Sequence, residues 1–269
     1  MSTQPARKPY PTDISDAAWE WIAPILAQPT GPGRPRTADI REMVNAIFYL
    51  DKTGCQWEML PHDFPDYRHV NYYYLEWTRT GKWDQVLERL RELARVAAGK
   101  QLEPTAGVID SQSVKTTGHG EARGYDAGKQ VKGRKRHIVV DTLGLLLLVM
   151  VTPASMQDRD GGVQLCDEIQ QQFARIKKLW ADSSYRGELV EYVQHWCRFV
   201  LEIVKRPPEQ RGFVVQPKRW IVERTLSWLN PFRRLSKDYE STTQSSESMI
   251  KIAHIHVLLR RIIPALYLL

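Results

Sequence analysis

Little in the sequence points to an oxidising compartment or to a membrane. The three cysteines, Cys55, Cys166 and Cys197, lie far apart and form no Cys-x-x-Cys pair, which argues against a disulfide framework and a zinc knuckle. The longest apolar run, residues 143–151, is nine residues long and too short to span a bilayer. The first ten residues contain no apolar stretch of the kind that a secretion signal requires. There is also no low-complexity block or internal repeat, so we expect a reduced, cytoplasmic, folded protein that does not contact a membrane.

What the sequence has in excess is positive charge, and this charge is unevenly distributed. The 269 residues carry a net charge of +7, with a pI near 9.3. Residues 111–140 contain seven Lys or Arg against two acids, and residues 205–237 contain nine against two, so the rest of the chain is net negative. Two concentrated basic segments favour a polyanionic partner, although a basic pI alone is common among soluble proteins.

The first hundred residues predict an all-α domain, residues 1–100. Apolar residues recur at helical spacing in four segments. These segments begin after Asp13 or Ser15, after Thr37, at Tyr67 and at Trp83. Pro24 is expected to kink or shorten the first helix, and a Pro/Gly-rich break over residues 28–36 separates it from the second.

The pattern changes at residues 101–107, where we place the start of a second domain, residues 101–269. Its elements are predicted in the order strand (108–114), hairpin (136–141 with 145–152), helix from Asp158 or Asp160, strand (176–181), helix (188–197), strand (199–204) and helices (220–229 and 247–259). This order is typical of a mixed sheet with helices on both faces. It predicts an α/β ribonuclease H-like domain with a five-stranded sheet.

Three apolar segments each end in a single carboxylate, at Asp110, Asp182 and Glu223. Asp110 lies on the first predicted strand and Asp182 at the end of a parallel neighbour, so both are expected at the same edge of the sheet. Glu223 lies on a predicted helix that can pack across this edge. Two aspartates and a glutamate can hold two magnesium ions, which clamp the attacking and leaving oxygens of a phosphodiester.

Spacing alone leaves other interpretations of these acids open. Asp110 and Asp182 could be turn or cap residues. Glu223 could form a surface ion pair with Arg219 or Arg224. Other glutamates compete for the third position, namely Glu188, Glu191, Glu202 and Glu209.

Five motifs carry a resemblance to a known family. They are Val-Ile-Asp110-Ser-Gln-Ser-Val-Lys-Thr, Arg-Gly-Tyr125-Asp-Ala-Gly-Lys, Lys-Gly-Arg134-Lys-Arg-His-Ile-Val-Val-Asp-Thr-Leu-Gly-Leu, Ala-Asp182-Ser-Ser-Tyr-Arg-Gly and Arg-Trp-Ile-Val-Glu223-Arg-Thr. In this order and spacing they resemble the DDE transposases of bacterial insertion sequences, and closely those of the insertion-sequence-five family. The resemblance spans nearly the whole chain.

The resemblance implies that Asp110, Asp182 and Glu223 are the catalytic, metal-binding triad, and it thereby selects Glu223 among the glutamates. It implies two Mg²⁺ ions, with Mn²⁺ as a substitute, and a homodimer that acts on double-stranded DNA in the bacterial nucleoid. The implied activity is binding of the element's terminal inverted repeats, DNA cleavage, and transfer of the 3′-hydroxyl ends into target DNA.

The chain departs from the family pattern in two places. Related transposases carry a Tyr-x-x-Arg-x-x-x-Glu signature with a lysine seven residues after the glutamate, but here Gln216 and Asn230 occupy the tyrosine and lysine positions. Only the contact of Arg219 with the end of the element can therefore be transferred from the family, and Lys237 could replace the missing lysine. Asp182 and Glu223 are only 41 positions apart, which leaves no room for the β-domain that some relatives insert there.

We expect two groups of DNA contacts, although such basic runs are usually solvated faces of a protein. Those expected to bind phosphate without reading sequence are Lys115, Lys129, Lys132, Arg134, Lys135, Arg136, Arg219 and Lys237. Sequence reading is assigned to Arg68, Asn71 and Tyr72, because residues 54–80 resemble a helix-turn-helix with its recognition helix over 67–80. Within Tyr72–Tyr74, at least one aromatic ring must pack in the core. Arg34 and Arg36 could form a minor-groove arm or a simple linker.

Other functions remain open at this point. The chain could be a catalytically silent, transposase-derived DNA-binding regulator, or a ribonuclease H-like nuclease without strand transfer. The intact triad argues against the first, and the DNA-reading helices argue against the second. A serine- or tyrosine-recombinase site lacks a supporting arginine/histidine signature; its candidate nucleophiles are Ser111, Ser183, Ser184 and Tyr185.

Overall fold

The regular elements that the structure describes in the N-terminal part of the protein are helices, as predicted. The computed structural model describes residues 7–27, 38–117, 120–204 and 218–261, so Arg34 and Arg36 lie outside the described residues. The elements are α1 (Asp16–Leu26), α2 (Ile40–Thr53), the short 3₁₀ helix η1 (Trp57–Met59), α3 (Tyr67–Arg79) and α4 (Lys82–Ala97). Ser15 caps α1, and Pro24 lies inside this helix near its end. Asp39, rather than the predicted Thr37, caps α2 by accepting hydrogen bonds from two backbone amides.

The connection between α2 and α3 is longer than a helix-turn-helix requires. Residues 54–66, including η1, join the two helices, whereas a helix-turn-helix uses a turn of roughly three to four residues. Gly54 ends α2 in the left-handed conformation with φ of 72°, which favours glycine. The region is therefore helical as predicted, with a more extended link before α3.

The second part of the chain contains the mixed sheet of a ribonuclease H-like domain. Its strands are β1 (Ala106–Lys115), β2 (Gly124–Asp126), β3 (Val131–Asp141), β4 (Leu146–Pro153), β5 (Lys178–Ala181) and β6 (Val200–Ile203). β3 pairs antiparallel with β1, β2 and β4, while β5 is parallel to both β1 and β6. The described sheet has six strands rather than the predicted five. The additional strand, β2, is three residues long and begins with a glycine, so no alternating pattern marks it in the sequence.

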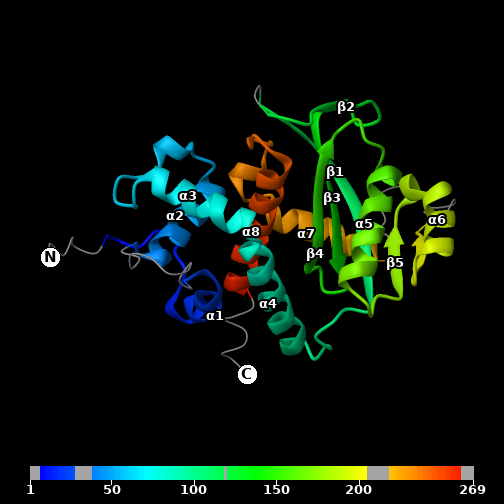
Figure 1. Ribbon diagram of the computed structural model, residues 1–269, viewed down its shortest axis with the longest axis horizontal. Helices are drawn as coiled ribbons and strands as arrows, with labels where there is room; N and C mark the ends of the chain where they lie inside the picture. The colour runs from blue at the N-terminus through cyan, green and yellow to red at the C-terminus, as the bar shows by residue number, and fades with distance from the viewer. Residues whose placement is uncertain (1–6, 28–37, 118–119, 205–217, 262–269) are drawn as a thin grey trace.

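Helices cover both faces of this sheet (Figure 1). On one face, α5 (Asp158–Gln172) and α6 (Glu188–Trp196) enclose a core with Ile109, Val139 and Leu179. The other face packs against α7 (Arg219–Leu229) and α8 (Thr243–Arg261). Because consecutive strand residues point to opposite faces, Val108 and Ile109 of β1 belong to different cores.

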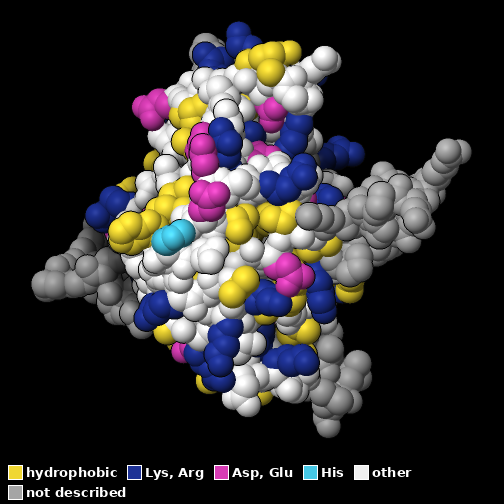
Figure 2. Space-filling view, turned by 90° about the vertical axis from the view of Figure 1, so that its right-hand side faces the viewer, with side chains coloured by type: hydrophobic (Ala, Val, Ile, Leu, Met, Phe, Trp, Pro, Cys, Tyr) yellow, Lys and Arg dark blue, Asp and Glu magenta, His cyan; other side chains and the backbone are white. Residues whose placement is uncertain are grey.

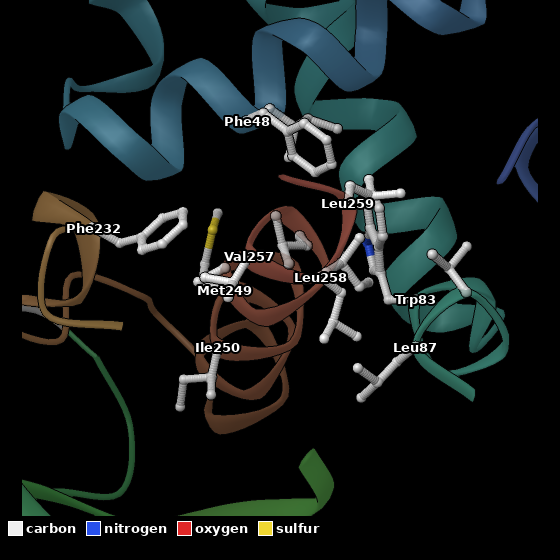
Figure 3. Packing of buried hydrophobic residues seen from close by; sticks show 14 of the residues in the cluster. Phe48, Trp83, Leu87, Phe232, Met249, Ile250, Val257, Leu258 and Leu259 are labelled. Atoms are coloured by element: carbon white, nitrogen blue, oxygen red, sulfur yellow. The ribbon is translucent and has the colours of Figure 1, made fainter. Parts of the chain in front are cut away.

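Helix α8 joins the N-terminal helices to the sheet. It is buried along most of its length, and its buried residues include serines and histidines as well as apolar side chains, as occurs in a helix enclosed by other elements. Figure 3 shows Phe48 of α2 and Trp83 of α4 beside Val257, Leu258 and Leu259 of α8. The division into residues 1–100 and 101–269 stays a prediction, since helices from both segments share one core.

Among the helices of the described residues, none combines the length and the apolar character needed to cross a membrane.

Candidate active site

The sheet brings Asp110 and Asp182 to matching positions on neighbouring strands. In the parallel pairing of β1 with β5, Ala106 lies opposite Lys178 and Val108 opposite Trp180. Continuing this register by two residues sets Asp110 opposite Asp182, which directly follows β5. Neighbouring strands are about 4.8 Å apart. Two carboxylates from strands 72 positions apart in sequence therefore meet at one place, as the sequence predicted.

Glu223 reaches this place from α7, and Arg219 links it to the strands. One guanidinium nitrogen of Arg219 lies 3.4 Å from a Glu223 carboxylate oxygen and 3.8 Å from an Asp182 carboxylate oxygen. Arg219 and Glu223 are four residues apart and share a helical face. The surface ion pair that competed with the metal interpretation is thus present, and it lies against Asp182.

Burial and the proximity of a second carboxylate both act on the charge of Asp110. Burial raises the pKa of Asp110 to about 6; the nearby Asp182 carboxylate also raises it, while the Ser111 amide, Arg219 and Lys129 lower it. Asp110 accepts a hydrogen bond of 2.7 Å from the Ser111 amide, and Asp182 accepts one of 2.8 Å from the Ser184 amide. These carboxylates consequently favour a cation beside them, a place that the Arg219 guanidinium partly fills.

The donor set fits a hard divalent cation. Within the described parts of the chain, no three His, Cys, Asp or Glu side chains are grouped closely enough to hold a metal ion. The Glu223 side chain is about half exposed, 47%, and turned towards Arg219. Carboxylate oxygens without sulfur or imidazole donors suit Mg²⁺ or Mn²⁺.

Of the four hydroxyl groups considered as nucleophiles, those of Ser111 and Tyr185 are buried, whereas Ser183 and Ser184 are exposed. Tyr185 is fully buried, and burial raises the pKa of its hydroxyl well above the ordinary value, with Asp110 among the charges that add to the effect. Ser111 is buried, and Ser184 donates a hydrogen bond to Asp182. The serine- or tyrosine-recombinase alternative gains no support from this arrangement.

Three of the residues predicted to contact DNA are buried and form their interactions within the protein. Arg134, Lys135 and Arg136 are 0%, 4% and 5% exposed. Arg134 pairs with Asp238 at 3.0 Å, and Lys135 with Asp158 at 2.8 Å. Arg136 donates to the Leu235 carbonyl oxygen at 3.0 Å. Phosphate cannot reach these groups, so we withdraw all three from the predicted contacts.

The remaining basic residues of the prediction reach the surface. Lys115, Lys129, Lys132 and Lys237 are exposed, and Arg219 is partly exposed. Arg219 contacts two of the carboxylates directly, and the Lys129 ammonium group lies beside Asp110, since it donates to the Ser111 hydroxyl at 3.2 Å. Lys and Arg side chains are scattered over the face shown in Figure 2, with a group at the top where Figure 1 shows β2.

The predicted sequence-reading residues lie away from this site. Helix α3 is separated from the sheet by α8 (Figure 1). Arg68 is exposed, Asn71 partly exposed and Tyr72 61% exposed. Tyr74 is the aromatic residue that packs inward, and its hydroxyl donates to the Ser245 carbonyl oxygen at 2.8 Å. The outer face of α3 is thus available to a partner.

Sequence reasoning missed the acids that neutralise the basic strand β3. Asp238 is buried behind it and pairs with Arg134, and Asp126 contacts Lys135 at 3.4 Å. Burial tends to raise the pKa of Asp126, but hydrogen bonds from Ser113 and Lys129 and the Lys135 charge lower it to about 2. Their common signal is that each acid lies next to a basic segment, Asp238 in a loop and Asp126 at the end of β2, and this signal is too weak to identify them in the sequence.

Comparison with known proteins assigns the class to which this fold and site belong. A family model described as "Transposase DDE domain" matches residues 101–258, which is more than half of the chain. A second, described as "Putative transposase of IS4/5 family", matches residues 14–87. The chain belongs to the DDE transposases of insertion sequences, and the predicted family is confirmed.

Two proteins of Burkholderia cepacia are similar to parts of the chain. The "Insertion element IS402 uncharacterized 16.2 kDa protein" is 30% identical over 118 residues, which cover 41% of this chain and 78% of that protein. The "Putative transposase for insertion sequence element IS402" is 28% identical over 127 residues, which cover 45% of this chain and 60% of that protein.

Proposed function

We propose that the protein binds the terminal inverted repeats of its insertion sequence, cleaves the DNA there, and joins the 3′-hydroxyl ends to target DNA. The observation that carries this proposal is the register that sets Asp110 opposite Asp182, with Glu223 linked to Asp182 through Arg219. A phosphodiester approaching this edge of the sheet would meet three carboxylates and one guanidinium.

The proposed cofactor is a pair of Mg²⁺ ions, for which Mn²⁺ can substitute. Asp110, Asp182 and Glu223 would hold them, and bound ions would activate a water or a DNA 3′-hydroxyl and stabilise the leaving oxygen. The remaining roles belong to the protein. Burial of Asp110 restricts water around the reacting phosphate, and Arg219 is positioned to neutralise phosphate charge once the carboxylates face a cation.

DNA positioning is proposed for the exposed cations around this edge. Lys129 approaches Ser111, next to Asp110. Lys115, Lys132 and Lys237 are exposed further along the sheet. Phosphate contacts of this kind hold the duplex without reading its sequence. Reading of the terminal repeats is proposed for α3, through Arg68, Asn71 and Tyr72.

A homodimer that acts on paired ends in the nucleoid completes the proposal, and it rests on the family resemblance. Two ends must be held together before joining, which a pair of identical subunits achieves by symmetry.

The experiment that tests the activity is strand cleavage and joining of a labelled duplex carrying the element's own terminal DNA, with and without Mg²⁺. Wild type should give metal-dependent nicks with 3′-hydroxyls, and then joined products. Asp182→Asn should still bind the ends but should not cleave them. Asp84→Asn is the matched control, because Asp84 is an exposed aspartate of α4, 57% exposed and paired with Lys251 away from the site.

Each result has a distinct meaning. Nicks without joined products would indicate a nuclease. Tight binding without cleavage by wild type under any metal would favour the regulator alternative. Equal loss of binding and cleavage in Asp182→Asn would overturn the assignment of Asp182 as a metal ligand.

A further inference from the structure

A basic pocket lies at the end of the sheet away from the three carboxylates. It has a volume of about 450 Å³ and is lined by Lys115, Thr116, Arg123, Tyr125, Gln130 and Lys132. The lining contains three cations and no carboxylate. By contrast, Arg134 and Lys135, which are buried and lie on the same strand β3 as Lys132, are each paired with an acid. The pocket is therefore basic, and none of its lining residues is an acid.

The two lysines of the pocket are available to a ligand. Both are exposed, and within the described residues neither ammonium group is paired with a carboxylate. Lys132 of β3 lies opposite Tyr125 of β2, and the Tyr125 side chain is 56% exposed. A phenol hydroxyl beside two ammonium groups supplies one neutral and two charged donors, a combination suited to phosphate oxygens.

The pocket is aligned with the candidate active site. Asp110 lies opposite Ile138, and steps of two residues along β3 lead from Ile138 to Lys132 on the same face of the sheet. Six residues of strand span roughly 20 Å, and a DNA duplex rises roughly 3.4 Å for each base pair. The pocket is thus roughly six base pairs, or about half a helical turn, from the reacting phosphodiester.

An exposed lysine lies on the path between the two places. Residues 237–239 run beside the end of β1, because the Asp238 amide donates to the Lys115 carbonyl oxygen at 2.8 Å and Thr116 forms a parallel bridge with Asp238. Arg136, two positions along β3 from Ile138, donates to the Lys237 carbonyl oxygen at 3.4 Å. The Lys237 side chain is exposed there, so positive charge continues from the carboxylates to the pocket.

We propose that this pocket binds the sugar-phosphate backbone of duplex DNA about half a helical turn from the cleaved bond, and that it fixes the direction in which the duplex leaves the active site. The proposal rests on the proposed function, since it takes DNA as the substrate. It adds Tyr125 and Arg123 to the DNA-contacting residues and gives the contact a position along the duplex. Phosphate binding at this point constrains rotation of the duplex about the scissile phosphate.

The first test is the salt dependence of affinity for a labelled mixed-sequence duplex, measured by fluorescence anisotropy. Each phosphate contact that is lost reduces the slope of log K against log salt by about 0.9. Lys115→Gln and Lys132→Gln should each reduce the slope by this amount. Lys100→Gln is the matched control, an exposed lysine before β1 at the opposite end of that strand, and it should keep the wild-type slope. Thermal unfolding of each variant confirms that it is folded.

The second test places the contact on the DNA. A photo-crosslinking residue, Tyr125→p-benzoylphenylalanine, is bound to a duplex carrying the element's end in Ca²⁺. Crosslinks should form about five to seven nucleotides from the position that Mg²⁺ then cleaves. The inference would be overturned if both lysine variants kept the wild-type salt slope. It would also be overturned if crosslinks formed beside the cleaved bond or more than a full helical turn away. In either case, cleavage by the wild-type protein would leave the proposed function intact. If the wild-type protein bound no duplex, both the inference and the proposed function would be overturned.

Discussion

Replacement of Arg134 tests whether the basic sequence of β3 serves folding or DNA binding. Its guanidinium is 0% exposed and lies 3.0 Å from an Asp238 carboxylate oxygen. It also donates to the carbonyl oxygens of Glu121 at 2.7 Å, Glu240 at 2.9 Å and Ser241 at 2.9 Å. The Arg134 side chain thus connects β3 to two loops, one containing Glu121 and the other containing residues 238–241. Arg134→Met keeps most of the side-chain volume and removes every one of these donors.

The expected loss of stability follows from what the substitution leaves behind. Asp238 is 2% exposed and would remain as a buried carboxylate without its cation, with hydrogen bonds only from the Glu240 amide and the Ser246 hydroxyl among its described partners. Breaking a buried pair by removing one partner costs about 3–5 kcal/mol. At about 2–4 °C for each kcal/mol in a chain of this size, the melting temperature should fall by roughly 6–20 °C.

The measurement is urea unfolding followed by fluorescence, with Lys132→Met as the matched control. Lys132 lies two residues away on the same strand but is exposed, so its replacement should change the free energy of unfolding by no more than about 0.5 kcal/mol. The salt dependence of DNA affinity should show the reverse. Folded Arg134→Met should keep the wild-type slope of log K against log salt, whereas Lys132→Met should have a smaller slope. Wild-type stability of Arg134→Met together with a reduced slope would refute the structural role and restore Arg134 to the DNA-binding surface.

Three further predictions concern the core and the site. Gly161→Ala should lower the free energy of unfolding by about 1–3 kcal/mol, because an added Cβ would lie 2.3 Å from the buried His137 ring. If the variant had the same free energy of unfolding in urea as wild type, this prediction would be contradicted. Burial lowers the pKa of His254 to about 3, and its ring nitrogen accepts the Leu146 amide hydrogen at 3.1 Å, so it is neutral when folded. The unfolded histidine binds a proton near pH 6.5, so stability is complete above that pH and should fall as the pH drops below it, by about 1.4 kcal/mol at pH 5.5 from this residue alone; a rise in the free energy of unfolding from pH 7 to pH 5.5 would show that other groups dominate. Asp110→Asn removes one of two crowded carboxylates, so the metal-free protein should melt no lower than wild type, while Mg²⁺ should no longer raise its melting temperature; equal stabilisation of both proteins by Mg²⁺ would place the metal elsewhere.

The sequence was sufficient for the elements with strong local signals. The apolar spacing and caps of α3 and α4 located both helices to within one residue at each end, because Asp66 accepts the Arg68 amide and Gly81 adopts a φ of 67°. The Asp141–Gly144 turn marked the β3–β4 hairpin, since the Asp141 carboxylate accepts the amides of the turn. These features depend on residues adjacent in the chain, which is why they can be predicted.

The partners of the basic strand could not be predicted in the same way. Lys132, Arg134 and Arg136 alternate with residues of the other face, which normally indicates that one side of a strand is in water. Both faces are covered instead. The segment around Asp238 covers one face and the start of α5, with Asp158, covers the other. These contacts join residues up to about a hundred positions apart, and no local pattern encodes them.

The distribution of paired and unpaired charge separates the structural cations from those available to DNA. Arg134 and Lys135 are held by acids at 3.0 Å and 2.8 Å, so their positive charge is cancelled within the fold and contributes little field at the surface. Lys115, Lys132 and Lys237 form no ion pair with a carboxylate among the described residues, and all three are exposed. A basic sequence window therefore overstates the DNA-binding charge, and the pairing of each cation decides which part of it a phosphate backbone can use.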